Sequence, residues 1–585
     1  CFIFIRSEIF FRIIKIQTNT YLKYYLYTQP IDKRNKMTAS KEEQFEALRS
    51  IHITIGASAT NIIGNPEFNL SKLRDLVTIL NKTELGPFNS TEHKKTILEL
   101  HILTALTVTE IFEDIIPSYR IKQKQEEEEK TKLSKDVIRL RQYERTFSSI
   151  YKNYLDYLKR MLESVKNKPA STFYRDLIAT TMQDREKLAE TATECYGKLL
   201  VAHPNFNYRD QIISNLVDCN AQTKHKKCAE LAHKYLCQAL KNDKLGEVSL
   251  EVTSVICELA KKRKLSISAL LFKTLLDLRL IDVKLADEEQ KKKWKAEMEK
   301  LASLKKKQSR KERKRGKKMK KLKKDMLESE AHVTTDQKLK YHKLILKKLF
   351  VTYFRLLKYH EDLDGEKRET KKFVKLLPPV LEGVSKFAHL IDVSICNDIF
   401  PLINRLLENR DITTNCKLHC LSTVFIIYKS LESELGRVDP EQFYKHFYVI
   451  LSNIDAADMT SQEFKSLDNC IHLMLIKRAK QVSAKRYCAF IRRLLILAIN
   501  LPPTTPNAVV APLLEATRRL FIQKPNVTAL FDSANCSDFG SGHWDIEVDD
   551  PDFSHADSSV AWEMHMLRNH TDETIRDFAH KVQAC

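Results

Sequence analysis

Glycine is scarce in this chain, at 11 of 585 residues, whereas ordinary globular chains use roughly 7%. Strand-rich folds need glycine at tight turns and bulges, and doubly wound α/β folds need it at phosphate-binding loops. The scarcity disfavours both classes and favours helices that are joined by short polar connections. The composition therefore predicts an all-α protein.

Long apolar runs are missing as well, since no stretch reaches 18 apolar residues without a charge. A helix needs about 20 such residues to cross a bilayer, so the sequence predicts no membrane span. The 13 cysteines are scattered and include no C-x2-C pair. This pattern indicates neither a disulfide framework nor a zinc finger, and it is typical of a reducing compartment.

Metal-ligand clusters are also lacking. Cys416, His419 and Cys420 come closest, but no second pair follows them downstream. We interpret the two thiols as buried and structural, because free cysteine is among the most buried residue types. Residues 545–552 resemble a calcium-binding loop, yet Asp550 stands where such a loop needs glycine. We therefore expect a solvated acidic connector there.

Catalytic motifs are absent too: the sequence has no phosphate-loop pattern, G-x-G-x-x-G turn, H-E-x-x-H pair or G-x-S-x-G elbow. His389 and His446 lie beside aromatic residues in helical patterns, where we expect core or interface histidines. The sequence therefore predicts a protein that is not an enzyme and needs no metal or cofactor. A cryptic enzyme is the alternative, which a pocket of converging titratable groups would favour.

Most of the net positive charge of the chain is concentrated in one segment. Residues 291–324 hold 19 Lys or Arg against three Glu, so +16 of the formal net charge of +22 lies in this segment. A dense field of one sign attracts polyanions by releasing their counterions, whereas the same charge spread thinly mostly keeps a protein in solution. The segment therefore indicates binding of nucleic acid through its phosphates. Aromatic residues are not interleaved, so base stacking is not indicated.

Fourteen cations within 20 residues are the predicted nucleic-acid ligands. They are Lys305, Lys306, Lys307, Arg310, Lys311, Arg313, Lys314, Arg315, Lys317, Lys318, Lys320, Lys321, Lys323 and Lys324. The alternative is a solvated charged helix or a nuclear-localisation signal. We interpret the smaller basic cluster at residues 261–264 as a helix end or an import signal.

Apolar residues recur at three- and four-residue steps through most of the chain, which predicts amphipathic helices. One helix ends before Pro117, and a long one is capped by Ser134 and has Val137 and Leu140 on its apolar face. A third begins at residues 439–440, with the aspartate as N-cap and the proline as first helical residue. No strict repeat is visible. We expect an irregular HEAT/armadillo-like helical solenoid, interrupted by the basic segment, which is largely helical or disordered.

Four stretches of the chain carry a family pattern. They are Thr109–Ile121, Phe350–Leu357 with Leu377–Ile391, Leu418–Leu421 with Asp439–Tyr444, and Ala561–Leu567 with Arg576–Ala579. In this order they resemble the nucleolar complex-associated protein 3 family. The third stretch is similar to the CCAAT-binding-factor domain that related nucleolar proteins share.

The resemblance implies a scaffold of the nucleus and nucleolus. It would accompany precursors of the large (60S) ribosomal subunit through maturation and intranuclear transport. The implied partners are a second nucleolar complex protein, the pre-60S particle and pre-ribosomal RNA, and no membrane. Family members are also linked to replication. The alternative is therefore a chromatin-binding adaptor in DNA replication initiation, with replication-licensing proteins and DNA as partners.

The second stretch, Phe350–Leu357 with Leu377–Ile391, resembles the family's central motif, and it supplies candidate residues for partner binding or for the core. They are Pro378, Pro379, Glu382, Gly383, Lys386, Phe387 and His389. We expect the two prolines to end one helix and to direct the next, because proline interrupts helical hydrogen bonding. We expect Gly383 to permit a close approach of two helices. The pattern is compatible with two roles for these seven residues, a direct contact with a partner and a purely structural role in the core.

Five regions are expected along the chain. The first opens without methionine, and we expect it to be translated leader ahead of Met37. The regions are 1–36, the non-native leader; 37–170, an N-terminal nucleolar-complex helical domain; 171–286, a helical repeat region; 287–330, the basic segment; and 331–585, a CCAAT-binding-factor-type helical domain.

Overall fold

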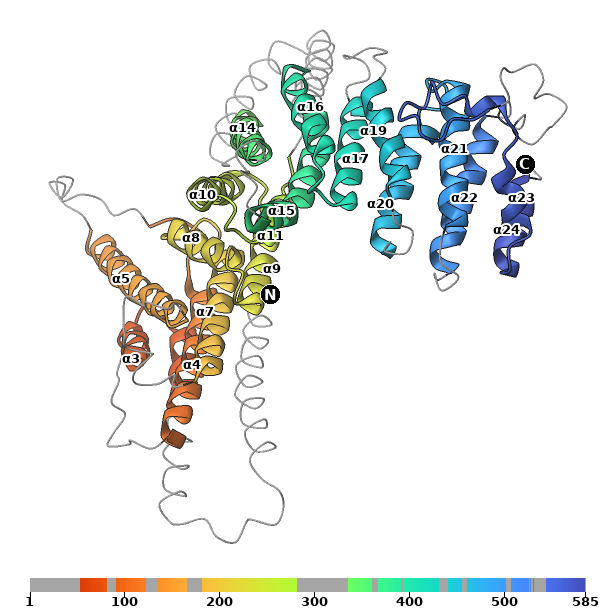
Figure 1. The fold of residues 1–585 in the computed structure, drawn as a ribbon. Coiled ribbons are helices and arrows are strands. Elements are labelled where there is room, and N and C mark those ends of the chain that lie inside the picture. Colours follow the sequence, from red (N-terminus) through yellow and green to blue (C-terminus); the bar gives the residue numbers. More distant parts are fainter. Residues whose placement is uncertain are drawn as a thin grey trace, which may run out of the picture. The chain divides into compact units, whose positions relative to one another are not determined.

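The computed structural model describes most of the helical part of the chain (Figure 1). The described residues are 53–81, 91–121, 134–165, 181–280, 335–359, 367–390, 393–430, 440–454, 460–500, 507–524, 527, 530 and 543–583. Every regular element in these ranges is a helix and none is a strand, which confirms the all-α prediction. The predicted leader and the basic segment 287–330 lie outside the described residues.

The chain divides into two compact units. The first contains α3 (Leu70–Asn81), α4 (Thr91–Ile115), α5 (Lys135–Glu163), α7 (Met182–Ala202), α8 (Arg209–Asn220), α9 (Lys226–Asn242), α10 (Glu247–Arg263) and α11 (Ala269–Leu275). The second contains α15 (Lys367–Lys386), η3 (Ala388–Leu390), α16 (Val393–Glu408), α17 (Thr414–Ser430), α19 (Glu441–Ser452), α20 (Ser461–Ile471), η4 (His472–Ile476), α21 (Ala484–Ile499), α22 (Asn507–Gln523), η7 (Ala556–Ser558), α23 (Trp562–Arg568) and α24 (Glu573–Gln583). The residues of α14 (Thr335–Lys358) are divided between the units after Lys348.

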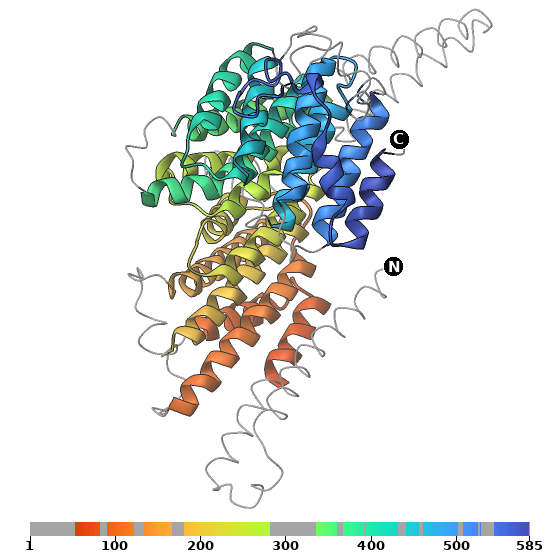
Figure 2. The same cartoon turned by 45° about the vertical axis from the view of Figure 1, so that its right-hand side comes forward.

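Helices of the first unit pack in two rows. In one row α4 packs against α7, α7 against α9 and α9 against α11; in the other α3 packs against α5 and α8 against α10. The rows meet where α5 packs on α7 and α8 on α9. Figure 2 shows α4, α7 and α9 as neighbours in this unit.

Tyrosines of α5 fill much of the core of the first unit. Tyr151, Tyr154 and Tyr157 are at most 1% exposed. The hydroxyl of Tyr154 donates to the carbonyl oxygen of Ala105 on α4 at 2.7 Å, and the ring of Tyr151 lies 5.0 Å from that of Phe112. A hydrogen bond offsets the cost of burying a tyrosine hydroxyl, so these contacts favour the packing of α5 on α4.

The second unit repeats one arrangement along its length. One row consists of α15, α17, α20, α22 and α24, each packed on the next; the other consists of α16, α19, α21 and α23. The rows are joined by α16 on α17, α21 on α22 and α23 on α24. Each helix buries its apolar face only against its neighbours, as in HEAT and armadillo stacks. The solenoid prediction is therefore confirmed.

The long helix capped by Ser134 confirms one prediction and corrects another. The hydroxyl of Ser134 accepts a hydrogen bond from the amide of Val137, as expected of an N-cap. However, Val137 and Leu140 are 39% and 47% exposed. Burial on α5 starts at Phe147, because the periodicity of a sequence shows which face is apolar but not where the neighbouring helix begins.

The predicted start of α19 is wrong by one residue. The helix begins at Glu441, so Pro440 is its N-cap and not its first residue. Proline suits either position because the amide hydrogen that it lacks has no helical acceptor at either. The apolar stripe that was expected to follow is confirmed, since Phe443, Phe447 and Ile450 are buried.

The acidic connector is anchored and not merely solvated. Asp550 pairs with Lys445 on α19 at 2.7 Å, and Asp552 pairs with Arg486 on α21 at 2.6 Å. The expectation of a solvated connector is therefore wrong for these two carboxylates, because the fold places cations beside them. Among the residues described, no group of three His, Cys, Asp or Glu is arranged to hold a metal ion. No helix in the described ranges is long and apolar enough to cross a membrane.

Candidate interaction surfaces

Five of the seven candidate residues, from Pro378 to Lys386, lie on α15, which runs without a break through both of its prolines. The expectation that Pro378 and Pro379 end one helix is therefore wrong. Pro378 has no amide hydrogen to donate to the carbonyl of Val374, one turn earlier. The thiol of Cys416 on α17 donates to that oxygen instead, at 3.6 Å. A neighbouring helix thus replaces the lost donor, which lets α15 continue.

Gly383 lies against the buried ring of Tyr353, as the expected close approach requires. A β-carbon at Gly383 would overlap the hydroxyl oxygen of Tyr353 and lie 2.7 Å from its Cζ atom. Tyr353 is 1% exposed, so its ring cannot swing into solvent without opening the core. The residue is on α14, and glycine therefore lets α14 and α15 approach closely.

The seven motif residues divide between the interior and the solvent. Pro379, Gly383 and Phe387 are buried, and Pro378 is half-buried. The other three, Glu382, Lys386 and His389, are exposed. Exposure of His389 contradicts a core histidine at that position and is compatible with an interface histidine. Partner contact by the exposed three stays a prediction.

The exposed motif residues belong to a basic face of α15 that was not predicted from the sequence. We define the outer face of α15 as its exposed residues within one helical stripe. They are Arg368, Lys371, Lys372, Lys375, Glu382 and Lys386, followed by His389 on η3. The steps of three, four and seven residues place them on one side of the helix. This spacing is readable in the sequence and could have identified the face.

The thiols nearest to a metal-ligand pattern are buried, as interpreted. Burial raises the pKa of Cys416 and, more strongly, that of Cys420. Burial also lowers the pKa of His419. Both cysteines are free thiols. A raised pKa keeps a thiol protonated at neutral pH, so neither is a thiolate nucleophile.

Three buried arginines of α21 form a cluster that the sequence did not reveal. Arg492 pairs with Glu563 at 3.1 Å, with exposures of 1% and 0%, and lies 4.0 Å from the ring centroid of Trp544. The guanidinium of Arg493 donates to the carbonyl oxygens of Ile546 and Val548, at 3.2 and 3.1 Å. Arg486 pairs with Asp552, as described above. Together these cations hold the segment 543–563 against α21.

The smaller basic cluster is a helix end, as interpreted, since Lys261, Lys262 and Arg263 occupy the last turn of α10. Cations in the last turn interact favourably with the helix dipole. The 14 predicted nucleic-acid ligands from Lys305 to Lys324 lie outside the described residues. Their role stays a prediction.

Two parts of the chain match known protein families. Residues 50–154 match the family described as Nucleolar complex-associated protein, which covers α3, α4 and most of α5. Residues 417–579 match the CBF/Mak21 family, which covers nearly all of the second unit from α17 onward.

Curated relatives extend the similarity to most of the chain. It is 33% identical over 546 residues to the Nucleolar complex protein 3 homolog of Danio rerio, which covers 92% of this chain and 64% of the relative. The human protein of the same name is 33% identical over 535 residues, with 91% and 62% covered. Nucleolar complex-associated protein 3 of Schizosaccharomyces pombe is 26% identical, with 90% and 69% covered. The chain thus spans slightly less than two thirds of the two vertebrate relatives.

Proposed function

We propose that this chain, which is similar to nucleolar complex protein 3 over most of its length, is a scaffold in ribosome assembly in the nucleolus and nucleus. It accompanies precursors of the large (60S) subunit through maturation and intranuclear transport. The observation that carries the proposal is the 33% identity over 92% of the chain. The stacked helices support it, because such stacks present extended surfaces to other macromolecules.

The outer face of α15 is the proposed contact with a second nucleolar complex protein. Its exposed cations, Arg368, Lys371, Lys372, Lys375 and Lys386, outnumber its one carboxylate, Glu382, even when the neighbouring exposed Glu369 is counted. An acidic segment of the partner would complement this face, and complementary charge speeds association and selects the partner.

The cations from Lys305 to Lys324 are the proposed contact with pre-ribosomal RNA. Fourteen positive charges in 20 residues can neutralise several phosphates at once. Binding of this kind reads backbone charge and not base identity. In this proposal the helices hold the proteins while the basic run holds the RNA.

Affinity purification of the tagged chain, with sequencing of the bound nucleic acid, tests the proposal. We expect pre-ribosomal RNA, ribosomal proteins and a nucleolar complex partner to copurify. A matched chain with the 14 cations replaced by Gln should lose the RNA and keep the protein partner. Recovery of origin DNA with helicase-loading proteins, and no preribosomes, would refute the proposal and favour the replication adaptor.

A further inference from the structure

The turn that joins η4 to α21 presents cations at the surface of the second unit. Lys477 and Lys480 are exposed, and Arg478 between them is half-buried. Lys429, in the last turn of α17, is exposed as well. Burial lowers the pKa of His472, and the charges of Lys477 and Lys429 lower it further, so both cations lie near the start of η4. We define the basic turn as Lys477, Arg478 and Lys480, with Lys429 beside it.

A π-helical turn sets where the basic turn lies. At the end of η4 the amide of Lys477 donates to the carbonyl oxygen of His472, five residues earlier, at 3.0 Å. Such turns are rare and recur at functional sites. Two buried tyrosines support this one, because the hydroxyls of Tyr444 and Tyr487 donate to carbonyl oxygens within η4, at 3.0 and 2.5 Å. The basic turn is thus held in place by the core of the unit.

Aromatic rings, and not an ion pair, hold Arg478. Its Cζ atom lies 5.8 Å from the ring centroid of Phe425 and 5.6 Å from that of Tyr428, both on α17. A cation near an aromatic ring is attracted by the quadrupole of the ring. This contact positions the guanidinium without neutralising its charge.

The basic turn and Lys429 form no ion pair with a carboxylate of the described part of the chain. Acidic residues of the neighbouring elements are already paired. Asp468, one turn before η4, pairs with Arg519 at 2.6 Å, and Asp552 pairs with Arg486 at the start of α21. The positive charge of this surface is therefore available to a ligand.

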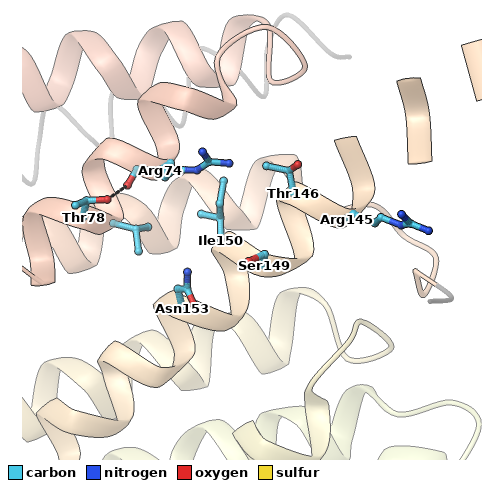
Figure 3. Close-up of a pocket in the computed structure, with 8 residues that line it drawn as sticks. Arg74, Thr78, Arg145, Thr146, Ser149, Ile150 and Asn153 are labelled. Atoms are coloured by element: carbon cyan, nitrogen blue, oxygen red, sulfur yellow. Dashed lines mark hydrogen bonds between the residues drawn. The ribbon is translucent and has the colours of Figure 1, made fainter. Parts of the chain in front are cut away.

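The groove between α3 and α5 in the first unit does not offer cations in this way. Its volume is about 370 Å³, and Arg74 and Arg145 are both among its lining residues. Figure 3 shows the side chain of Arg145 directed away from the other residues around the groove. The groove therefore does not present two guanidinium groups to one anion, whereas the basic turn places three cations within four residues.

The surroundings of the basic turn suit a nucleic-acid backbone better than a protein helix. No large apolar side chain is exposed among the residues described between Val351 and Ile522. Protein interfaces depend on aromatic and aliphatic anchors near their centre, whereas interfaces with nucleic acid are more polar and strongly positive. Lysine offers a phosphate a point charge with three donors, and such contacts read the backbone and not the bases.

We propose that the basic turn and Lys429 bind the phosphates of an RNA strand. The proposal rests on the proposed function only in taking RNA as the polyanion. It adds an RNA contact on the second unit to the contact that we propose for the basic run from Lys305 to Lys324.

The test measures binding of a labelled oligouridine to the full chain by fluorescence anisotropy. The background chain has the 14 cations from Lys305 to Lys324 replaced by Gln, so that the basic turn is measured without them. In this background, Lys477→Gln with Lys480→Gln should weaken binding about tenfold or more, since two phosphate contacts are lost. The slope of log affinity against log salt should become shallower by about 1.4, at about 0.7 for each contact with a single strand. Addition of Lys429→Gln should weaken binding further.

Arg410→Gln with Lys465→Gln is the matched control. It also removes two exposed cations from the second unit, but they lie toward the amino-terminal ends of α17 and α20, away from η4. Both pairs of substitutions should leave the thermal midpoint unchanged, because all four residues are exposed. We expect less than a twofold effect of the control on RNA binding. Equal losses in the two variants, or no RNA binding by the background chain, would overturn the proposal.

Two further ligands test the choice of RNA. Polyglutamate that binds as tightly as oligouridine, with the same dependence on Lys477 and Lys480, would overturn it in favour of an acidic protein segment. Oligothymidine of the same length that binds more tightly than oligouridine would overturn it in favour of DNA. We expect both to bind more weakly than oligouridine.

Crosslinking of RNA to the unaltered chain gives a second measurement that needs no substitution. Mass spectrometry should place crosslinks on the segment 471–486, and their absence there would count against the basic turn. The proposed function fails if the unaltered chain copurifies no preribosomes. The basic turn fails if RNA binding by the background chain does not depend on Lys477 and Lys480, so the two failures are distinguishable.

Discussion

Buried charges show how single residues hold the second unit together. Arg492 and Glu563 are almost fully excluded from solvent, so each depends on the other to offset the cost of leaving water. Arg492 also donates to Ser559 and lies over the ring of Trp544. Such a cation ties the irregular segment after residue 543 to α21 more firmly than an exposed ion pair could.

Removal of the Glu563 carboxylate should therefore lower the stability of the fold strongly. Glu563→Ala leaves the guanidinium of Arg492 buried without its carboxylate, and we expect a loss of about 3 to 5 kcal/mol in the free energy of unfolding. Urea denaturation followed by circular dichroism measures it. The control is Glu515→Ala, whose pair with Arg518 is 36–40% exposed and should contribute less than about 1 kcal/mol. Similar losses in both variants would contradict the role of burial.

His101 should make the stability of the first unit depend on pH. Burial lowers the pKa of His101 to about 4, and its Nδ1 lies 2.9 Å from the hydroxyl of Tyr157. In the unfolded chain the pKa is about 6.5. Between these values the unfolded state binds the extra proton, so stability falls as pH falls from about 6.5 to 4, by up to about 3 kcal/mol.

Urea denaturation at several pH values checks this, with His101→Asn as the comparison. Asparagine can keep the hydrogen bond to Tyr157 but cannot take up a proton. The difference in unfolding free energy between the two chains should change across this pH window and be constant above it. A constant difference throughout would show that His101 does not titrate as expected.

Helix α15 combines an inner face that packs and an outer face that is charged. Its inner face accepts Pro378 because α17 supplies a donor from Cys416, and it needs a glycine where Tyr353 approaches. Its outer face has no such packing constraint and carries mostly cations. The two faces can therefore be altered separately.

On the inner face, Gly383→Ala should destabilise the fold. The added methyl group overlaps the ring of Tyr353, and overpacking of this kind costs about 1 to 3 kcal/mol. Thermal unfolding measures the change. Gly64→Ala is the control, because nothing lies within 4 Å of a β-carbon at Gly64. Tyr353→Phe should recover part of the loss, since it removes the closest atom; no recovery would point to another source of strain.

On the outer face, reversal of charge should weaken partner binding without unfolding the chain. Lys371→Glu with Lys375→Glu places acidic groups where we propose an acidic partner docks, and like charges across an interface oppose association. Copurification of the nucleolar complex partner should fall about tenfold or more, with an unchanged thermal midpoint. Lys465→Glu with Lys485→Glu, on exposed positions of α20 and α21, is the matched control. Equal loss in the control would indicate a general charge effect.

At the scale of the whole molecule, charge and packing are separated along the chain. The described residues form two helical units with their own cores, whereas most of the net charge lies in residues 291–324. A scaffold that holds both protein and nucleic acid needs both properties. The concentration of charge in one segment lets RNA binding change without disturbing the cores.

The full chain should therefore bind RNA with a steep salt dependence. If six to ten phosphates are neutralised, affinity should fall by roughly three to five decades between 50 and 200 mM salt. Titration of labelled RNA at several salt concentrations measures the slope. Replacement of the 14 cations by Gln should remove most of the dependence of RNA affinity on salt concentration. A slope that does not change would place the main RNA contact elsewhere.

The sequence alone determined what depends on local spacing and composition. Scarce glycine and three- and four-residue periodicity predicted the helices, Ser134 predicted a cap, and the four motif stretches predicted the relatives. Tertiary structure decided what depends on neighbours distant in the chain. Pro378 lies inside a helix because Cys416 is beside it, and Arg492 is buried because Glu563 meets it. Val77 and Ile150 line one groove because α3 packs on α5. No local pattern encodes such contacts, since each depends on which helix the fold brings alongside.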